Sequence, residues 1–294
     1  MTATTQHPLY RRSVFLIILG GCCLSLLGIG MRIMDNADVL QIAFYRSLSQ
    51  GLFLSFVLFY LNGSNSLNDV ASMGARGVII CCLIAAAGLF MILSIKHTSV
   101  ANAVFIVSLA PLTSAILGRV FLQEAVSLRT WLAIFIAIVG VALIFGDGLS
   151  GGGLLGMFFA LLMMLFYSSS IVTTRSQNQA NMIAVCALSG FILAASVYPF
   201  IDTLQLSVKD LVICVGLGAI QIGLGLVLVM TGAQYVPAAQ VSLLALMEVV
   251  LSPIWVWVGV GETPSLLSLV GGTVVIVGVV IQTLDTAKNN LAST

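Results

Sequence analysis

The sequence has little charge, little histidine and no metal-ligating pattern. Only 7% of its 294 residues are charged, whereas 60% are hydrophobic, and it has two histidines. A soluble chain carries about a quarter charged residues, because water must be satisfied at its surface. The net charge of +1 offers no field for nucleic acid, and the six cysteines form no CxxC or Cys/His spacing. These absences exclude an ordinary soluble domain, and they predict no metal, no cofactor and no nucleic-acid partner.

Long apolar runs are what the sequence has instead. A bilayer core of about 30 Å needs roughly 20 apolar residues in a helix. Ten segments meet this requirement: 13–31, 39–61, 77–95, 99–121, 130–146, 154–173, 182–201, 210–230, 238–258 and 266–284. The links between them are short, so successive helices must run antiparallel. We therefore predict an all-α integral membrane protein with ten transmembrane helices.

The few positive charges predict its orientation. Seven Lys and Arg residues lie at the N-terminus, in the even-numbered loops or at the C-terminus, and three lie in or beside the odd-numbered loops. The positive-inside rule then puts both termini in the cytoplasm. The sequence predicts a multi-pass protein of the cell (inner) membrane.

The second half of the chain repeats the first at an offset of 138 residues. Glu124-Ala-Val-Ser-Leu matches Glu262-Thr-Pro-Ser-Leu, and Ile138-Val-Gly-Val recurs as Ile276-Val-Gly-Val. We expect two repeats, 1–147 and 148–294, with five helices each. Five is odd, so the second repeat must enter the membrane upside down. Inverted repeats of this kind are typical of secondary transporters, which bind substrate between the two halves.

Several segments resemble the drug/metabolite transporter superfamily, in particular its EamA-type ten-helix branch. They are Lys96-His-Thr-Ser-Val-Ala-Asn-Ala, Leu109-Ala-Pro, Phe121-Leu-Gln-Glu, Tyr235-Val-Pro-Ala-Ala-Gln-Val-Ser-Leu-Leu, and Arg46 in Phe-Tyr-Arg. The chain departs from the family pattern at Glu248-Val249, where Glu-Pro is usual, and at Leu122-Gln-Glu, where Leu-Gly-Glu is usual. The resemblance implies a central cavity bounded by helices 1, 3, 4, 6, 8 and 9, with helices 5 and 10 peripheral. It also implies alternating-access transport, commonly export, of small metabolites such as amino acids.

Two ionisable residues, Arg46 and Glu248, lie deep within predicted spans. Such groups are costly in the membrane and tend to face the interior. Three interpretations stay open: a structural ion pair, a substrate carboxylate bound by Arg46, or a proton-coupling role for Glu248. A counter-substrate is a further possible partner, and the sequence leaves monomer and homodimer open.

Uncharged polar residues form a second set of candidates for substrate or coupling-ion contact. They are Gln221, Asn102, Gln240, Tyr45 and Tyr167. The alternative for each is an interhelical hydrogen bond, worth about 0.6 kcal/mol on average. Trp255, near the end of the ninth span, is expected in an interfacial aromatic belt.

Two prolines and two glutamates are candidates for helix breaks and gating. Pro111 and Pro253 fall inside the fourth and ninth spans, where a proline removes a helix hydrogen bond. Such a proline either interrupts a helix beside the binding site or makes a simple packing kink, and both interpretations stay open. Glu124 and Glu262 sit at turns at the membrane edge, on opposite sides by this topology. A channel or a membrane-embedded enzyme remains the alternative to a transporter. A channel would need a continuous polar stripe and an enzyme would need clustered catalytic groups, and neither pattern is found; we predict that the protein is not an enzyme.

Overall fold

The computed structural model describes residues 8–63, 66, 72–123, 127–151, 153–175, 181–234, 236 and 238–292. These residues form helices, turns and loops, with no strand among them. The α-helices are α1 (Pro8–Leu24), α2 (Leu27–Arg32), α3 (Val39–Asn62), α5 (Gly74–His97), α6 (Val100–Val107), α7 (Ala110–Leu122), α8 (Leu128–Gly151), α9 (Leu154–Arg175), α10 (Met182–Val197), α11 (Val208–Gly216), α12 (Gly225–Ala233), α13 (Ala238–Val260) and α14 (Leu266–Ala292). A 3₁₀ turn, η2 (Tyr198–Phe200), follows α10, and a π-helix, η3 (Leu217–Leu224), joins α11 to α12.

Length and apolar composition confirm the predicted membrane protein. Eight helical segments in the described residues are long and apolar enough to cross a bilayer, among them Val39–Asn62 and Gly74–His97. Two shorter apolar helices, Leu246–Val260 and Leu266–Ile281, fall at the ninth and tenth predicted spans. The observed helices therefore account for the ten segments expected from hydropathy.

Three of the spans are interrupted. The first breaks between α1 and α2 at Ser25–Leu26, and the fourth breaks between α6 and α7 at Ser108–Leu109. The fourth break fits the predicted effect of Pro111, which lies in the first turn of α7. Pro253, in contrast, lies inside the continuous helix α13, so of the two interpretations the break is not found. The eighth span contains η3, a π-helix of the kind often found at functional sites.

The packing of the spans follows the internal repeat. The fifth span (α8) packs along the tenth (α14), and the second (α3) along the seventh (α10). The third span (α5) packs on the sixth (α9), and the eighth (α12) packs on the first (α1). Suppose that each span is replaced by its equivalent in the other half. The contact of the fifth span with the tenth and that of the second with the seventh then map onto themselves, and the contact of the third with the sixth maps onto that of the eighth with the first. This is the pattern expected of two related five-helix repeats.

Backbone contacts between α8 and α14 carry the same symmetry. A Cβ on Gly140 would lie 2.6 Å from the carbonyl oxygen of Gly271, and one on Gly278 would lie 2.9 Å from that of Ala133. Gly278 is the equivalent of Gly140 in the second repeat, 138 positions later. Ala133 is the equivalent of Gly271 in the first repeat, 138 positions earlier. The sequence offset is thus reproduced in space. Small residues allow such close approach of membrane helices.

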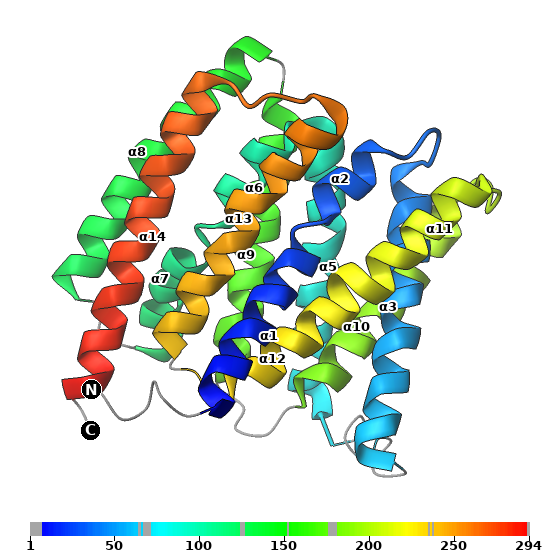
Figure 1. The fold of residues 1–294 in the computed structure, drawn as a ribbon, viewed down its shortest axis with the longest axis horizontal. Helices are drawn as coiled ribbons and strands as arrows, with labels where there is room; N and C mark the ends of the chain where they lie inside the picture. The colour runs from blue at the N-terminus through cyan, green and yellow to red at the C-terminus, as the bar shows by residue number, and fades with distance from the viewer. Residues whose placement is uncertain are drawn as a thin grey trace.

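The helix ends lie at two opposite faces of the molecule. In Figure 1 the start of α1 and the end of α14 lie at the lower face, whereas the end of α2 and the start of α11 lie at the upper face. Helices α8 and α14 form the left edge and α3 lies at the right, with α1, α9 and α13 between them. The position of α8 and α14 agrees with the peripheral placement predicted for the fifth and tenth spans.

Candidate functional site

Arg46 is fixed in the second span by close backbone packing on both sides. Helix α3 begins after Asp38, whose side chain and that of Gln41 form a capping box, and Arg46 follows two turns later. A Cβ on Gly218 of η3 would collide with the carbonyl oxygen of Arg46. On the side of α10, a Cβ on Gly190 would lie 2.6 Å from the carbonyl oxygen of Ser47. The backbone that carries Arg46 is therefore held between two neighbouring helices.

The guanidinium of Arg46 is buried and only partly hydrogen-bonded. Its side chain is 3% exposed, and Nη2 donates to Oε1 of Gln221 over 3.1 Å. The Gln221 amide nitrogen donates in turn to the carbonyl oxygen of Leu24, over 3.0 Å, at the end of α1. Nε of Arg46 is buried without a hydrogen-bond acceptor. Gln221 is therefore a positioning residue, and Arg46 retains donor capacity that the protein does not use.

Glu248 of α13 and Tyr167 of α9 lie within electrostatic range of one another, and Glu248 is also within range of Arg46. Both side chains nevertheless have accessible surface, and Tyr167 is 41% exposed. In the described part of the chain no ion pair joins Arg46 to Glu248. The structural ion pair, one of the three interpretations that the sequence left open, is thus not formed here.

Of the remaining candidate residues, Tyr45 and Asn102 form hydrogen bonds with other segments of the protein, and two others cannot be placed. The Tyr45 hydroxyl donates to the carbonyl oxygen of Leu204, 2.7 Å away, and so anchors the segment after η2. Oδ1 of Asn102 accepts from the hydroxyl of Ser268 in α14, which is an interhelical hydrogen bond. The side chain of Gln240 and the whole of Glu124 lie outside the described residues.

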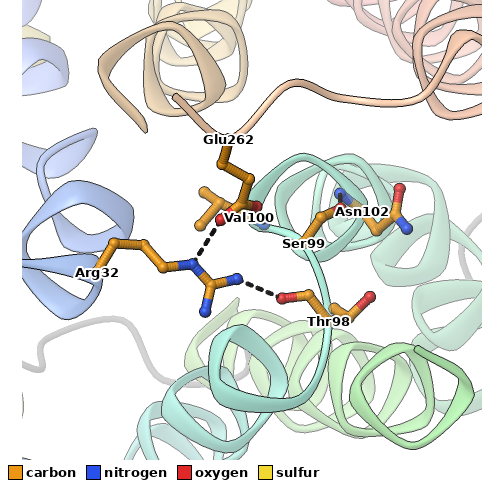
Figure 2. Close-up of polar contacts among 6 residues, drawn as sticks. All are labelled: Arg32, Thr98, Ser99, Val100, Asn102 and Glu262. Carbon is orange, nitrogen blue, oxygen red and sulfur yellow. Dashed lines mark hydrogen bonds and ion pairs between the residues drawn. The ribbon is translucent and has the colours of Figure 1, made fainter. Parts of the chain in front are cut away.

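Glu262 joins three separate segments at the upper face, as Figure 2 shows. Its Oε2 lies 2.6 Å from Nε of Arg32 at the end of α2, and its Oε1 accepts from the backbone N–H of Val100 over 3.0 Å. Arg32 also donates through Nη2 to the carbonyl oxygen of Thr98 over 2.7 Å. We call Arg32, Thr98, Val100 and Glu262 the Arg32–Glu262 latch.

Sequence reasoning missed Arg32, Ser25 and the inward role of Trp255. Trp255 does not simply join an aromatic belt, because its Nε1 donates to the hydroxyl of Ser25 over 2.8 Å. Ser25 lies at the break of the first span and its neighbour in space cannot be read from the sequence. Arg32 follows the first predicted span and Glu262 follows the ninth, so the topology puts both on the same side of the membrane, and that shared side was the available signal for their pairing.

The two five-helix repeats, the interrupted spans and the polar groups around the buried Arg46 define a polytopic membrane protein of the inverted-repeat class. Comparison with protein families gives a match to the EamA-like transporter family over residues 11–146 and 154–284. The chain belongs to the EamA-like transporter family. This confirms the resemblance noted from the sequence and supports a general role in transport.

Comparison with solved structures shows the same fold. One chain, described as "Crystal structure of protein", has a TM-score of 0.66 and 15% sequence identity, covering 94% of this chain and 98% of that one. No curated protein matches the sequence. At this level of identity the solved structure indicates the architecture alone.

Proposed function

We propose that this protein is a secondary transporter, working as an exporter of small metabolites such as amino acids across the cell (inner) membrane. The observation that carries the proposal is the incompletely paired cluster of Arg46, Glu248 and Tyr167 within an inverted-repeat fold. Substrate would bind in a central cavity between the repeats 1–147 and 148–294. Transport would proceed by alternating exposure of that cavity to the two sides of the membrane.

The Arg46 side of the cluster favours a carboxylate. A buried hydrogen-bond donor without an acceptor carries a free-energy penalty, and a ligand that supplies the acceptor removes it. The planar guanidinium matches a carboxylate particularly well, because two parallel N–H groups can bind its two oxygens. Nε of Arg46, which is without an acceptor, is available for this contact.

The Glu248 side favours a positive charge. Its carboxylate makes no hydrogen bond or ion pair with the described residues, and part of its surface is accessible. Either the ammonium group of a zwitterionic substrate or a transported proton would neutralise it. Tyr167, within electrostatic range of this carboxylate, adds a hydroxyl on a neighbouring helix. A molecule carrying both a carboxylate and an ammonium group would therefore complement the cluster from both sides.

Counterflow in proteoliposomes tests the proposal. Vesicles containing the purified protein are loaded with one unlabelled amino acid at a time, and uptake of the same labelled amino acid is followed. We expect transient accumulation for at least one zwitterionic substrate, with loss of the signal in Arg46→Gln and Glu248→Gln. Lys209→Gln, in an exposed surface ion pair, is the matched control and should keep the flux. Non-saturable flux without counterflow would indicate a channel, and no flux for any substrate would contradict the proposal.

A further inference from the structure

The Arg32–Glu262 latch joins the two repeats at the upper face. Arg32, Thr98 and Val100 belong to the first repeat, and Glu262 belongs to the second. The carboxylate of Glu262 binds the guanidinium with one oxygen and the first N–H of α6 with the other, so both oxygens are used. Side-chain exposure of only 26% for Arg32 and 27% for Glu262 places the contact partly inside the protein. Separation of the repeats at this face requires that these hydrogen bonds break.

Helix α2 connects the latch with the interior through close packing. A Cβ on Gly28 would lie 2.5 Å from Cγ1 of Val100, so α2 lies directly against the first turn of α6. On another side, a Cβ on Gly30 would lie 2.7 Å from a methyl carbon of Leu217 in η3. Helix α2 also packs on α13. The two glycines therefore bring α2 into direct contact with Val100 of α6 and with Leu217 of η3.

The other end of α2 is tied to the Arg46 cluster. The carbonyl oxygen of Leu24, freed by the break before α2, accepts from Gln221, which in turn accepts from Arg46. Ser25, the next residue, accepts from Trp255 of α13, two turns beyond Glu248. Arg32 follows Leu24 by eight residues, or about 12 Å along a helix. The polar cluster and the latch therefore lie at opposite ends of one short helical element.

We propose that the Arg32–Glu262 latch is the gate of the upper face, closed in this structure, and that α2 is the strut that couples it to Arg46. This inference rests on the proposed transport function. A ligand that draws Arg46 away from Gln221 would release Leu24 and α2, and Arg32 would then leave Glu262. Opening would therefore follow occupation of the cluster rather than occur at random.

Thiol labelling measures the gate directly. In a protein whose six native cysteines are replaced by alanine, Ala101→Cys places one thiol in the first turn of α6, where the native side chain is 2% exposed. A membrane-impermeant maleimide is added at the upper face. We expect slow labelling with the latch intact and about tenfold faster labelling in Arg32→Gln and Glu262→Gln, because loss of a charge-assisted hydrogen bond shifts the closed population by that order. Equal rates would overturn the gate.

Two further arms test the strut and the specificity. Gln221→Leu and Trp255→Phe lie away from the latch but should also accelerate labelling of the thiol at position 101; parental rates in both would overturn the coupling. Lys209→Gln removes another ion pair at the same face, the one with Asp35. The two segments stay joined there, because the backbone N–H groups of Asp35 and Asn36 donate to the carboxylate of Asp210. Its labelling should not change, and acceleration equal to that of Glu262→Gln would overturn the assignment of the gate to Glu262.

Unfolding is separated from gating by a second reporter. A protein that keeps only native Cys81, which is fully buried, should stay unlabelled in every variant that retains its fold. Fast labelling at position 101 together with fast labelling of Cys81 would mean loosening of the whole fold and would overturn the gate. None of these measurements needs a substrate, so a failed counterflow screen would contradict the proposed function while the labelling still reports on the gate.

Discussion

Arg46 and Gln221 are 175 positions apart in the chain, and a hydrogen bond of 3.1 Å joins them inside the protein. The contact links the second span to the eighth, and therefore the first repeat to the second. Gln221 occupies the π-helix η3, whose wider turn shifts the side chains relative to a regular helix. The local distortion thus serves to bring an amide between Arg46 and the broken end of α1.

Loss of the Gln221 amide should destabilise the protein. Gln221→Leu keeps the size of the side chain but leaves Arg46 buried without its acceptor and Leu24 without its donor. We expect the free energy of unfolding to fall by about 1–3 kcal/mol, the usual cost of an unsatisfied buried polar group. The thermal unfolding midpoint in detergent measures it. Gln205→Leu, on an exposed loop, is the control, and identical midpoints for both variants would show that the amide is not structural.

Neutralisation of Glu248 should affect transport and not stability. Glu248→Gln retains the shape, and no described ion pair is lost, so the thermal midpoint should stay near that of the parent. Initial flux of the substrate found by counterflow should fall at least about tenfold, which corresponds to about 1.4 kcal/mol of lost interaction. Asp202→Asn, an exposed acidic residue, serves as the control. A Glu248→Gln protein with parental flux at every pH would remove this residue from the mechanism.

Close packing between α8 and α14 should be intolerant of a single methyl group. In Gly271→Ala the new Cβ would lie 2.6 Å from the carbonyl oxygen of Gly140, and backbone cannot move aside cheaply. We expect overpacking to cost about 1–3 kcal/mol, measured as a lower thermal midpoint. Gly216→Ala, where a Cβ would meet nothing within 4 Å, is the matched control and should keep or raise the midpoint. A Gly271→Ala protein as stable as the control would contradict the helix crossing.

Orientation in the membrane can be tested with single cysteines. Both Asp202 and Ala75 are exposed, and they belong to opposite faces in the predicted topology. With the termini in the cytoplasm, Asp202→Cys should react with an impermeant thiol reagent on intact cells. Ala75→Cys should react only after permeabilisation. The reverse pattern would invert the topology and would place the Arg32–Glu262 latch on the cytoplasmic side.

The sequence predicted the membrane spans well because hydropathy acts over a whole helix. The second predicted span, 39–61, agrees with the observed helix Val39–Asn62 within one residue at its end. The repeat was visible because Glu124, Glu262, Gly140 and Gly278 keep their spacing. Pro111 indicated the break of the fourth span, since an interior proline removes a helix hydrogen bond and kinks or breaks the helix.

Interruptions caused by distant contacts could not be predicted. Nothing local marks the break at Ser25–Leu26, which is stabilised by hydrogen bonds from Gln221 and Trp255, 197 and 230 positions away. For Pro253 the sequence left both a break and a packing kink open, and α13 continues through it. The positions of Arg46 and Glu248 inside spans were predictable from the sequence. The hydrogen bond from Arg46 to Gln221 was not, because it depends on the rotation of η3.

The crossing of α8 and α14 bears on how such a chain could arise. Gly140 meets Gly271 and Gly278 meets Ala133, so equivalent positions of the two repeats form equivalent contacts. This is the rule for an isologous dimer, in which one surface binds a second copy of itself. A single five-helix protein that inserts into the bilayer in both orientations would therefore already have a self-complementary antiparallel interface. Fusion of two copies of its gene would fix at synthesis the opposite orientations that separate subunits must find by diffusion.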